Sequence, residues 1–207
     1  MSSPSVAADG RALGRRGLRT RHRLLEATGG LLETGGVRDL RVVDIAREVG
    51  ASPATFYQYF RDVEEAVLAL AEEVAEDLAP VARLVAEPWT TTAARRMVEG
   101  FVSSWDEHRA VLRTRNLAAQ EGDQRFRAVR NASLLPITRA LAQQIRGSQA
   151  AGRVAQDVSA IAGASALVAM TERVAAFHRE IEELGVTRDA LIATTARMID
   201  QTVSGPS

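Results

Sequence analysis

The sequence contains no cysteine and no lysine, and only 4% of its residues are aromatic. The absence of cysteine excludes disulfide bonds and thiolate chemistry. The absence of lysine makes every permanent cation an arginine, whose planar guanidinium group offers several hydrogen-bond donors to a phosphate. No run approaches the ~20 apolar residues of a membrane span, and the first ten residues lack the apolar core of a secretory signal. We therefore expect a cytoplasmic protein.

Catalytic patterns are also missing. The three histidines, His22, His108 and His178, have no metal-ligand spacing and no triad-like neighbours. Glu172 and His178 are six residues apart, so they fall on different faces of a helix. No phosphate loop, nucleophile elbow or dinucleotide fingerprint is present. These absences argue against an enzyme, and we predict no catalytic residue, no metal site and no cofactor.

Aliphatic residues dominate what is present. Hydrophobic residues make up 46% of the 207 positions, with few runs typical of strands. This composition predicts an all-α protein with an aliphatic core. We expect nine helices, three in an N-terminal head and six in a C-terminal body. They are predicted over residues 20–34, 42–49, 53–59, 62–86, 92–107, 109–119, 123–146, 158–179 and 188–203.

Charge is distributed unevenly, although the formal net charge is zero. Up to residue 60, nine arginines stand against six acidic residues, and the rest of the chain carries a net charge of −3. Residues 11–23 hold six arginines and no acidic residue. A basic head on a mildly acidic body favours phosphate binding at one end of the molecule.

Residues 42–60 predict two short helices joined by a tight turn. Gly50 is a suitable helix stop, because a residue without Cβ adopts left-handed dihedrals at little cost. Ser52 suits the N-cap of the second helix, and Pro53 suits its first position. Two phenylalanines four residues apart anchor that helix inward. This arrangement is typical of the helix-turn-helix DNA-reading unit.

Residues 20–68 also resemble the DNA-binding head of the tetracycline-repressor (TetR) family. The resemblance is carried by Ile45, Ala46, Gly50, Ser52, Thr55, Tyr57 and Phe60. It implies a flexible basic arm over residues 1–18, a helix-turn-helix domain over 19–61, and a ligand-binding and dimerisation domain over 62–207. It further implies a homodimeric repressor that binds a palindromic operator and is released by a small hydrophobic ligand.

The second short helix of such a unit lies in the major groove. Candidates for base proximity are Ser52, Pro53, Ala54 and Gln58, of which Gln58 has bidentate potential toward adenine. The hydroxyls of Thr55, Tyr57 and Tyr59 suit phosphate oxygens, which position a protein on DNA rather than specify a sequence. For both tyrosines, a half-buried supporting role is the alternative interpretation.

Three positions depart from the pattern of the resembled family. The family usually has Ser or Thr where Arg41 stands, so this arginine loses the capping role but keeps the reach to a phosphate. Val63 replaces a usual lysine, and Val43 stands where some relatives place a polar base-reading side chain. In the arm, Arg15, Arg16 and Arg19 either track DNA phosphates or belong to a solvated tail. Both interpretations are open.

The last two predicted helices are rich in small residues among aliphatic ones. In the resembled family they form a four-helix bundle with the partner's copies, which implies dimerisation. The alternative is that they only close the core of the monomer. The candidate dimerisation residues are Ile161, Ala164, Ser165, Val168, Leu191, Thr195 and Met198.

The five aromatic residues outside the head, together with Met97 and Met170, could line an apolar ligand cavity, although a plain core position suits most of them individually. Residues 103–113 and 167–178 resemble the subgroup that contains mycobacterial repressors of the ethionamide-activating monooxygenase, which has a hydrophobic tunnel. That subgroup has Asn at two positions occupied here by Val168 and Thr171, so Thr171 is the remaining polar anchor. The candidate ligand-binding residues are Trp89, Met97, Phe101, Trp105, Phe126, Leu134, Val168, Met170, Thr171 and Phe177.

We expect the helix that begins at Asp62 to transmit ligand binding to the head, because a ligand that prefers a splayed dimer would tilt it. A DNA-binding regulator without small-molecule input, acting as an architectural or partner-controlled factor, is the alternative function. Activation instead of repression also remains open, because it depends on where the operator lies.

Overall fold

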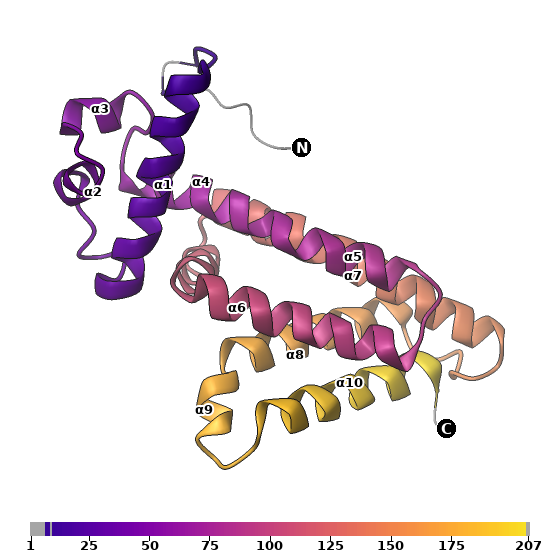
Figure 1. The fold of residues 1–207 in the computed structure, drawn as a ribbon. Coiled ribbons are helices and arrows are strands. Elements are labelled where there is room, and N and C mark those ends of the chain that lie inside the picture. Colours follow the sequence, from indigo (N-terminus) through magenta and orange to yellow (C-terminus); the bar gives the residue numbers. More distant parts are fainter. Residues whose placement is uncertain (1–6, 9, 206–207) are drawn as a thin grey trace. The chain divides into compact units, whose positions relative to one another are not determined.

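The computed structural model describes residues 7, 8 and 10–205, and its secondary structure there is helical with no strand element (Figure 1). The predicted all-α fold with an N-terminal helix-turn-helix is confirmed. None of the described helices is long and apolar enough to cross a membrane. The elements are α1 (Arg15–Gly35), α2 (Val42–Glu48), α3 (Pro53–Tyr57), α4 (Val63–Ala75), the 3-10 helix η1 (Glu76–Leu78), α5 (Ala79–Ala86), α6 (Thr91–Gln120), α7 (Gln124–Ala150), α8 (Ala160–Ala176), α9 (His178–Glu182) and α10 (Arg188–Ser204).

The chain divides into two compact units. The head unit comprises the described residues of 1–75 together with 108–130, and the body unit comprises 76–107 together with the described residues of 131–207. The predicted domain boundary at 61/62 stays a prediction. The chain leaves the head unit at η1, and it returns next to His108, whose dihedrals of φ −134° and ψ 32° interrupt α6. Two of the three crossings therefore coincide with breaks in α-helical geometry, while the third, between residues 130 and 131, lies inside α7.

The core of the head unit joins α1, α2, α3 and α4. Leu24, Ile45, Phe56 and Phe60 are all buried in it, and α2 and α3 lie on the same side of α1 (Figure 1). A Cβ on Gly29 would lie 3.3 Å from Leu70 Cδ2, so this glycine lets α1 and α4 approach closely. A Cβ on the neighbouring Gly30 would meet no atom within 4 Å, so the close approach involves Gly29 alone of this pair.

Two side-chain carboxylates cap the start of α4 in the manner of a capping box. The carboxylate of Asp62 accepts a hydrogen bond from the Glu65 N–H at 2.7 Å, and the Glu65 carboxylate accepts one from the Arg61 N–H at 2.5 Å. These contacts satisfy backbone donors that the first helical turn leaves unpaired. Arg21 of α1 adds an ion pair with Glu73 of α4 at 3.2 Å.

In the body unit, α8 and α10 run antiparallel, connected through α9 (Figure 1). Ser159 and Thr187 cap α8 and α10 through their side-chain oxygens. Where α5 packs on α6, a Cβ on Gly100 would lie 2.5 Å from Val81 Cγ2, so only glycine fits this contact. Trp89 Nε1 donates to Asp200 at 2.8 Å and ties the α5–α6 connection to the end of α10.

Several predicted helix boundaries differ from the structure. The first helix begins at Arg15 rather than residue 20, and the helix predicted over 62–86 is broken by η1. Pro80 explains the break, because it lacks an N–H for the helical ladder and stands in the first turn of the new helix α5. The helices predicted over 92–107 and 109–119 correspond to the two parts of α6 on either side of the break at His108. The helix predicted over 158–179 ends at Ala176.

Candidate nucleic-acid interface

The turn between α2 and α3 has the predicted geometry. Gly50 has φ +65°, a conformation that L side chains rarely adopt, and its N–H donates to the Arg47 carbonyl at 3.0 Å. The Ala51 N–H returns to the Ala46 carbonyl at 2.8 Å, and Arg23 Nη2 donates to the Val49 carbonyl at 2.7 Å. The carbonyls of Ala46, Arg47 and Val49 at the end of α2 are thereby satisfied, which helps to fix the angle at which α3 leaves the turn.

Ser52 is the N-cap of α3, as predicted. Its Oγ accepts from the Thr55 N–H at 3.2 Å and lies 3.0 Å from Thr55 Oγ1. Pro53 follows in the first helical turn, where its missing N–H costs nothing. Arg41, at the corresponding position of α2, makes no side-chain cap hydrogen bond, as its chemistry predicts.

The two faces of α3 separate cleanly. Phe56 and Phe60 are 0% and 1% exposed, with ring centroids 5.5 Å apart, and Arg21 lies over the Phe60 ring. Tyr57 is 52% exposed, and its ring meets the Phe56 ring edge-on. Buried anchors on one face hold the helix down and leave the opposite face for a partner.

The structure brings the predicted DNA-contacting residues of the turn and α3 together at this outward face. Ser52, Pro53, Ala54, Tyr57 and Gln58 are exposed, while Thr55 and Tyr59 are partly buried. Arg41 is exposed on the approach to α2, and Val43 of α2 is 51% exposed. Their contact with DNA stays a prediction.

The arm makes a contact that the sequence did not indicate. The Ala8 N–H donates to the Gln58 carbonyl at 2.9 Å, Ala7 is 6% exposed, and the Ala7 N–H donates to the Arg11 carbonyl at 2.8 Å. Residues 1–6 and 9 of the predicted arm lie outside the described residues. The part of the arm that the structure describes therefore turns back onto the end of α3.

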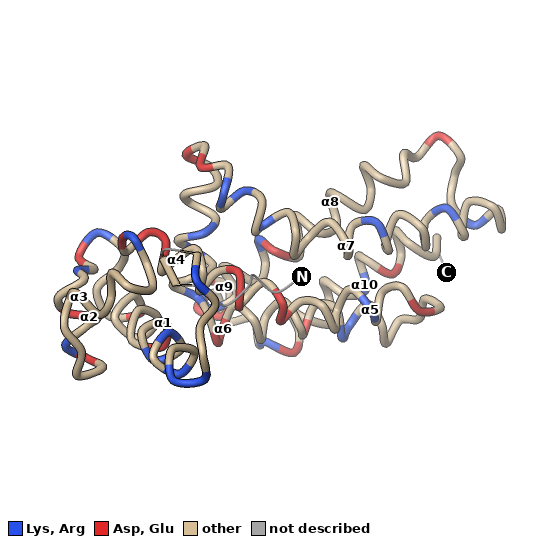
Figure 2. The backbone as a smooth tube through the Cα atoms, turned by 90° about the horizontal axis from the view of Figure 1, so that it is seen from above, with Lys and Arg blue, Asp and Glu red and all other residues tan. Residues whose placement is uncertain are grey.

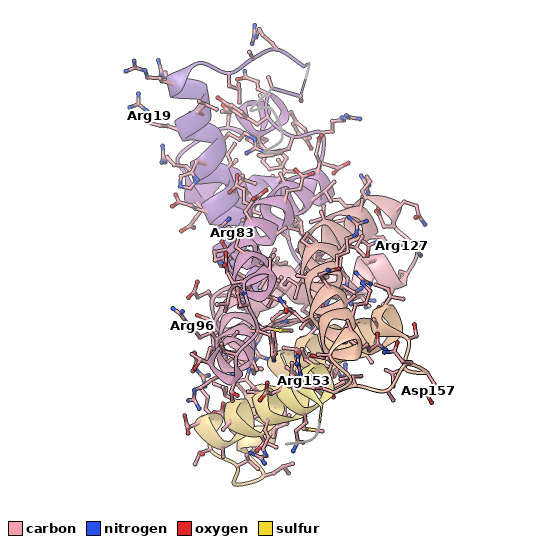
Figure 3. The ribbon with its side chains drawn as sticks, turned by 90° about the vertical axis from the view of Figure 1, so that its right-hand side faces the viewer. Arg19, Arg83, Arg96, Arg127, Arg153 and Asp157 are labelled. Carbon is pink, nitrogen blue, oxygen red and sulfur yellow. The ribbon has the colours of Figure 1, made fainter. Side chains whose placement is uncertain are left out.

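The arginines of the arm lie partly in a helix. Because α1 begins at Arg15, it includes Arg15, Arg16 and Arg19, all of them exposed. Figure 2 shows the arginine positions of α1 in blue, close together along the helix, and in Figure 3 the side chain of Arg19 extends away from it. The helical backbone fixes the spacing of these charges.

The candidate dimerisation residues divide into two groups in the body unit. Ile161 and Met198 are 51% and 52% exposed, Ser165 is also exposed, and Leu191 is partly buried. Ala164, Val168 and Thr195 are at most 4% exposed, so they pack in the interior of the body unit. The outward faces carry further small residues: Ala162, Ala166 and Ala169 on α8, and Ala190, Ala193 and Thr194 on α10.

Most candidate ligand-binding residues are buried in the body unit: Met97, Phe101, Trp105, Leu134, Val168 and Thr171 are each at most 6% exposed. Phe126 is buried in the head unit. Trp89 and Met170 are partly buried, and Phe177 is 37% exposed beneath the Arg173 guanidinium at 3.7 Å. The Thr171 hydroxyl donates to the Leu167 carbonyl at 2.7 Å, so it is left to act as an acceptor.

An open groove of about 550 Å³ lies between α5 and the first half of α6. Its lining includes none of the ten candidate ligand-binding residues. Arg83 and Arg96, labelled in Figure 3, are exposed on its two helices, and the buried Oγ of Ser104 has no hydrogen-bond partner among the described residues. The groove lies on the surface of two helices, and no pattern in the sequence indicated it.

A cluster of charges around His178 was also missed, because its members are up to 82 residues apart in the chain. The Asp106 carboxylate contacts His178 Nε2 at 3.1 Å, Arg179 Nη2 at 2.9 Å and Arg188 Nη2 at 2.7 Å. His178 is fully buried, and its Nδ1–H donates to the Ala175 carbonyl at 2.7 Å. Burial raises the pKa of Asp106, but the Arg179 hydrogen bond and the charges of His178 and Arg188 outweigh it and lower that pKa. The cluster joins α6, α9 and α10.

Comparison with known proteins agrees with this architecture. Residues 24–70 match the family model for bacterial regulatory proteins of the tetR family, and residues 81–207 match that for the tetracyclin repressor-like C-terminal domain. No curated protein matches the chain.

Solved structures with a similar fold include the regulator FadR from Bacillus subtilis in complex with stearoyl-CoA, at 14% identity and a TM-score of 0.67 over 90% of this chain and 99% of that one. Another is a transcriptional regulator from Saccharomonospora viridis in complex with choline, at 22% identity and a TM-score of 0.65 over 90% and 96%. The fold is that of transcriptional regulators, which are not enzymes. Since the two models together span the helix-turn-helix and most of the remaining chain, the protein belongs to the TetR family of bacterial transcriptional regulators.

Proposed function

We propose that this TetR-family regulator is a homodimeric repressor of the cytoplasm that binds a near-palindromic operator and is released by a small hydrophobic effector. The observation that carries the proposal is the separation of faces on α3. Phe56 and Phe60 are buried, while Pro53, Ala54 and Tyr57 are exposed on a helix whose direction the Gly50 turn fixes. This is the geometry that inserts a helix into the major groove.

Dimerisation is part of the proposal, because one head reads too few base pairs to be selective. The partner surface is the outward face of α8 and α10, where Ile161 and Met198 stand half-exposed among alanines. Small side chains let helices approach closely, and the apolar ones gain by leaving water. Two heads then meet half-sites about one helical turn, ~34–36 Å, apart.

For the effector, the buried set around Met97, Phe101 and Trp105 in the body unit supports an apolar site. Thr171 would accept a hydrogen bond from the ligand, because its own proton is used by Leu167. Structural neighbours bind stearoyl-CoA and choline, so the fold admits effectors of different chemistry. The proposed likeness to the subgroup of mycobacterial repressors of the ethionamide-activating monooxygenase favours a mainly hydrophobic one.

Effector control would pass along the helices that link the units. The chain runs through α4, η1 and α5 where the sequence predicted one continuous helix, and the 3-10 helix Glu76–Leu78 connects the two α-helices. A ligand that prefers one of two arrangements shifts the population toward it and, by reciprocity, DNA weakens ligand binding by the same factor.

The test is a selection of genomic fragments that the full-length protein retains against random competitor DNA. We expect recovered fragments to share a two-fold-related motif, and retention of random sequence alone would contradict the proposal. A thermal-shift screen then tests effector input, because a ligand of the folded state raises the unfolding midpoint. A regulator without small-molecule input would bind the same motif. In that case no compound that raises the unfolding midpoint would weaken the binding of the protein to this DNA.

A further inference from the structure

The outward face of α3 lacks charged groups. Within Pro53–Tyr57 the exposed side chains are those of Pro53, Ala54 and Tyr57, and the flanking exposed residues are Ser52 and Gln58. The commonest specific contact to guanine is an arginine or lysine bidentate to O6 and N7. No residue of α3 can make that contact.

The hydroxyls of the first turn are already engaged. Ser52 Oγ accepts from the Thr55 N–H, and the Ser52 and Thr55 hydroxyls lie 3.0 Å apart and share one proton between them. One O–H of the pair therefore remains to donate outward. The chemistry left at the N-terminal end of α3 is mainly the apolar surface of Pro53 and Ala54.

Among the base edges of the major groove, the apolar group is the C5-methyl of thymine. At the other end of α3, the exposed side-chain amide of Gln58 matches the N6 and N7 positions of adenine. Its backbone is held in place, because the Gln58 carbonyl accepts the Ala8 N–H at 2.9 Å and the Gln58 N–H donates to the Thr55 carbonyl at 3.2 Å. The N-terminal end of α3 thus suits thymine, and Gln58 at its other end suits adenine.

We propose that α3 reads A·T base pairs in each operator half-site, with Pro53 and Ala54 against thymine methyl groups and the Gln58 amide on an adenine edge. This inference rests on the proposed function, since it assumes that the head binds operator DNA. It adds the chemical class of the bases that this helix selects. Burial of one methyl group corresponds to about a fourfold change in affinity.

The experiment uses the full-length protein and an operator fragment recovered by the genomic selection. Each thymine is replaced singly by deoxyuridine, which removes the methyl group and leaves base pairing unchanged. We expect about fourfold weaker binding at one or two positions of each half-site and unchanged binding at the others. In the Ala54→Gly variant, deoxyuridine should no longer weaken binding at one of these positions. Ala128→Gly, a change at an exposed alanine of α7, should leave the weakening at every position as it is in the parent protein.

A second variant does not depend on the stability of the short helix. Gln58→Glu keeps the size of an exposed side chain but replaces the amide donor by an acceptor, which matches the N4 amino group of cytosine. We expect the preferred base at one position of each half-site to change from adenine toward cytosine. An unchanged preference would overturn the assignment of Gln58.

The two proposals fail in different ways. Specific operator binding with equal affinity for thymine and deoxyuridine at every position would overturn the inference and leave the proposed function standing. An operator with guanine at the base positions that contact Pro53 and Ala54 would likewise overturn the inference alone. Retention of no specific fragment would remove the proposed function and this inference with it.

Discussion

The head and body units expose different kinds of surface. In the head, large apolar side chains such as Phe56 and Leu24 are completely buried, and the outward face of α3 carries hydroxyls, an amide and small groups. In the body, α8 and α10 leave Ile161 and Met198 half-exposed beside alanines. The head therefore suits a hydrated polar partner such as DNA, whereas the body face suits a partner that excludes water.

The two units also differ in how their helices are positioned. The short helices of the head are set by local devices, namely the Ser52 cap, the Gly50 turn and the Asp62 capping box. The long helices of the body are held by contacts between distant residues, such as Trp89 with Asp200 and Asp106 with Arg188. Substitutions on the exposed face of the head should act on DNA binding, and those on the exposed face of the body on assembly, whereas substitutions of buried residues in either unit should act on stability.

The largest expected effect is the difference in stability between substitutions on the buried and on the exposed face of α3. Phe56→Ala removes a fully buried ring and should cost about 3–5 kcal/mol of stability, a large part of the ~5–15 kcal/mol of a typical domain. Tyr57→Ala, at a half-exposed neighbour, should leave stability nearly unchanged. Urea unfolding followed by circular dichroism measures both. Equal destabilisation by the two substitutions would show that the faces are not distinct.

A charge on the exposed face of the body tests its role in assembly. Ile161→Asp would place a carboxylate in the proposed dimer interface, and we expect dimer dissociation to become at least about 100-fold easier. Sedimentation velocity over a concentration series measures this change. Leu184→Asp is the matched control, because Leu184 is 82% exposed outside α8 and α10. If both variants dimerise like the parent protein, the partner surface lies elsewhere.

The close approach of α5 and α6 gives a smaller effect confined to the body. Gly100→Ala places a Cβ 2.5 Å from Val81 Cγ2, and we expect a loss of about 1–3 kcal/mol. Val81→Ala in the same chain should recover part of that loss, because it removes the clashing atom. Gly163→Ala, where the nearest atom lies at an ordinary 3.5 Å, serves as the control. Destabilisation that Val81→Ala does not relieve would argue against the clash.

The Asp106 cluster gives the smallest effect and makes it depend on pH. Because the folded-state pKa of Asp106 lies below its ordinary value of 3.8, its stabilisation is complete above that value and is lost as pH falls through the lowered pKa. Asp106→Asn should lower Tm by about 2–8 °C at neutral pH. The difference in Tm between parent and variant should shrink below pH ~4. A difference that stays constant down to pH 2 would contradict this account.

The parts predictable from sequence are those that neighbouring residues determine. The Ser52 cap, the Pro53 start, the left-handed Gly50 and the inward Phe56–Phe60 pair each follow from local chemistry, and the structure has them all. The break at η1 was harder, because Pro80 inside an apolar repeat suits either a kink or a new helix start. On a mostly apolar helix such as α8, periodicity alone did not tell that Ala164 faces inward and Ile161 outward.

Contacts between residues that are far apart in the chain leave no pattern in the sequence from which they could be predicted. Asp106 and His178 are 72 positions apart, and only the folding of α6, α9 and α10 brings them together. The same applies to Ala8 and Gln58, whose backbone hydrogen bond places the arm against α3. These contacts depend on packing, which a single sequence does not encode at any fixed spacing.

Quantitative hydroxyl-radical footprinting on a selected operator fragment tests most directly whether two copies of α3 read DNA. We expect two protected half-sites centred about one helical turn, ~10 base pairs, apart. Tyr57→Ala should weaken protection of both about tenfold, as expected for loss of a phosphate contact, while Leu184→Ala should not. A single protected site, or protection that Tyr57→Ala leaves unchanged, would contradict the account.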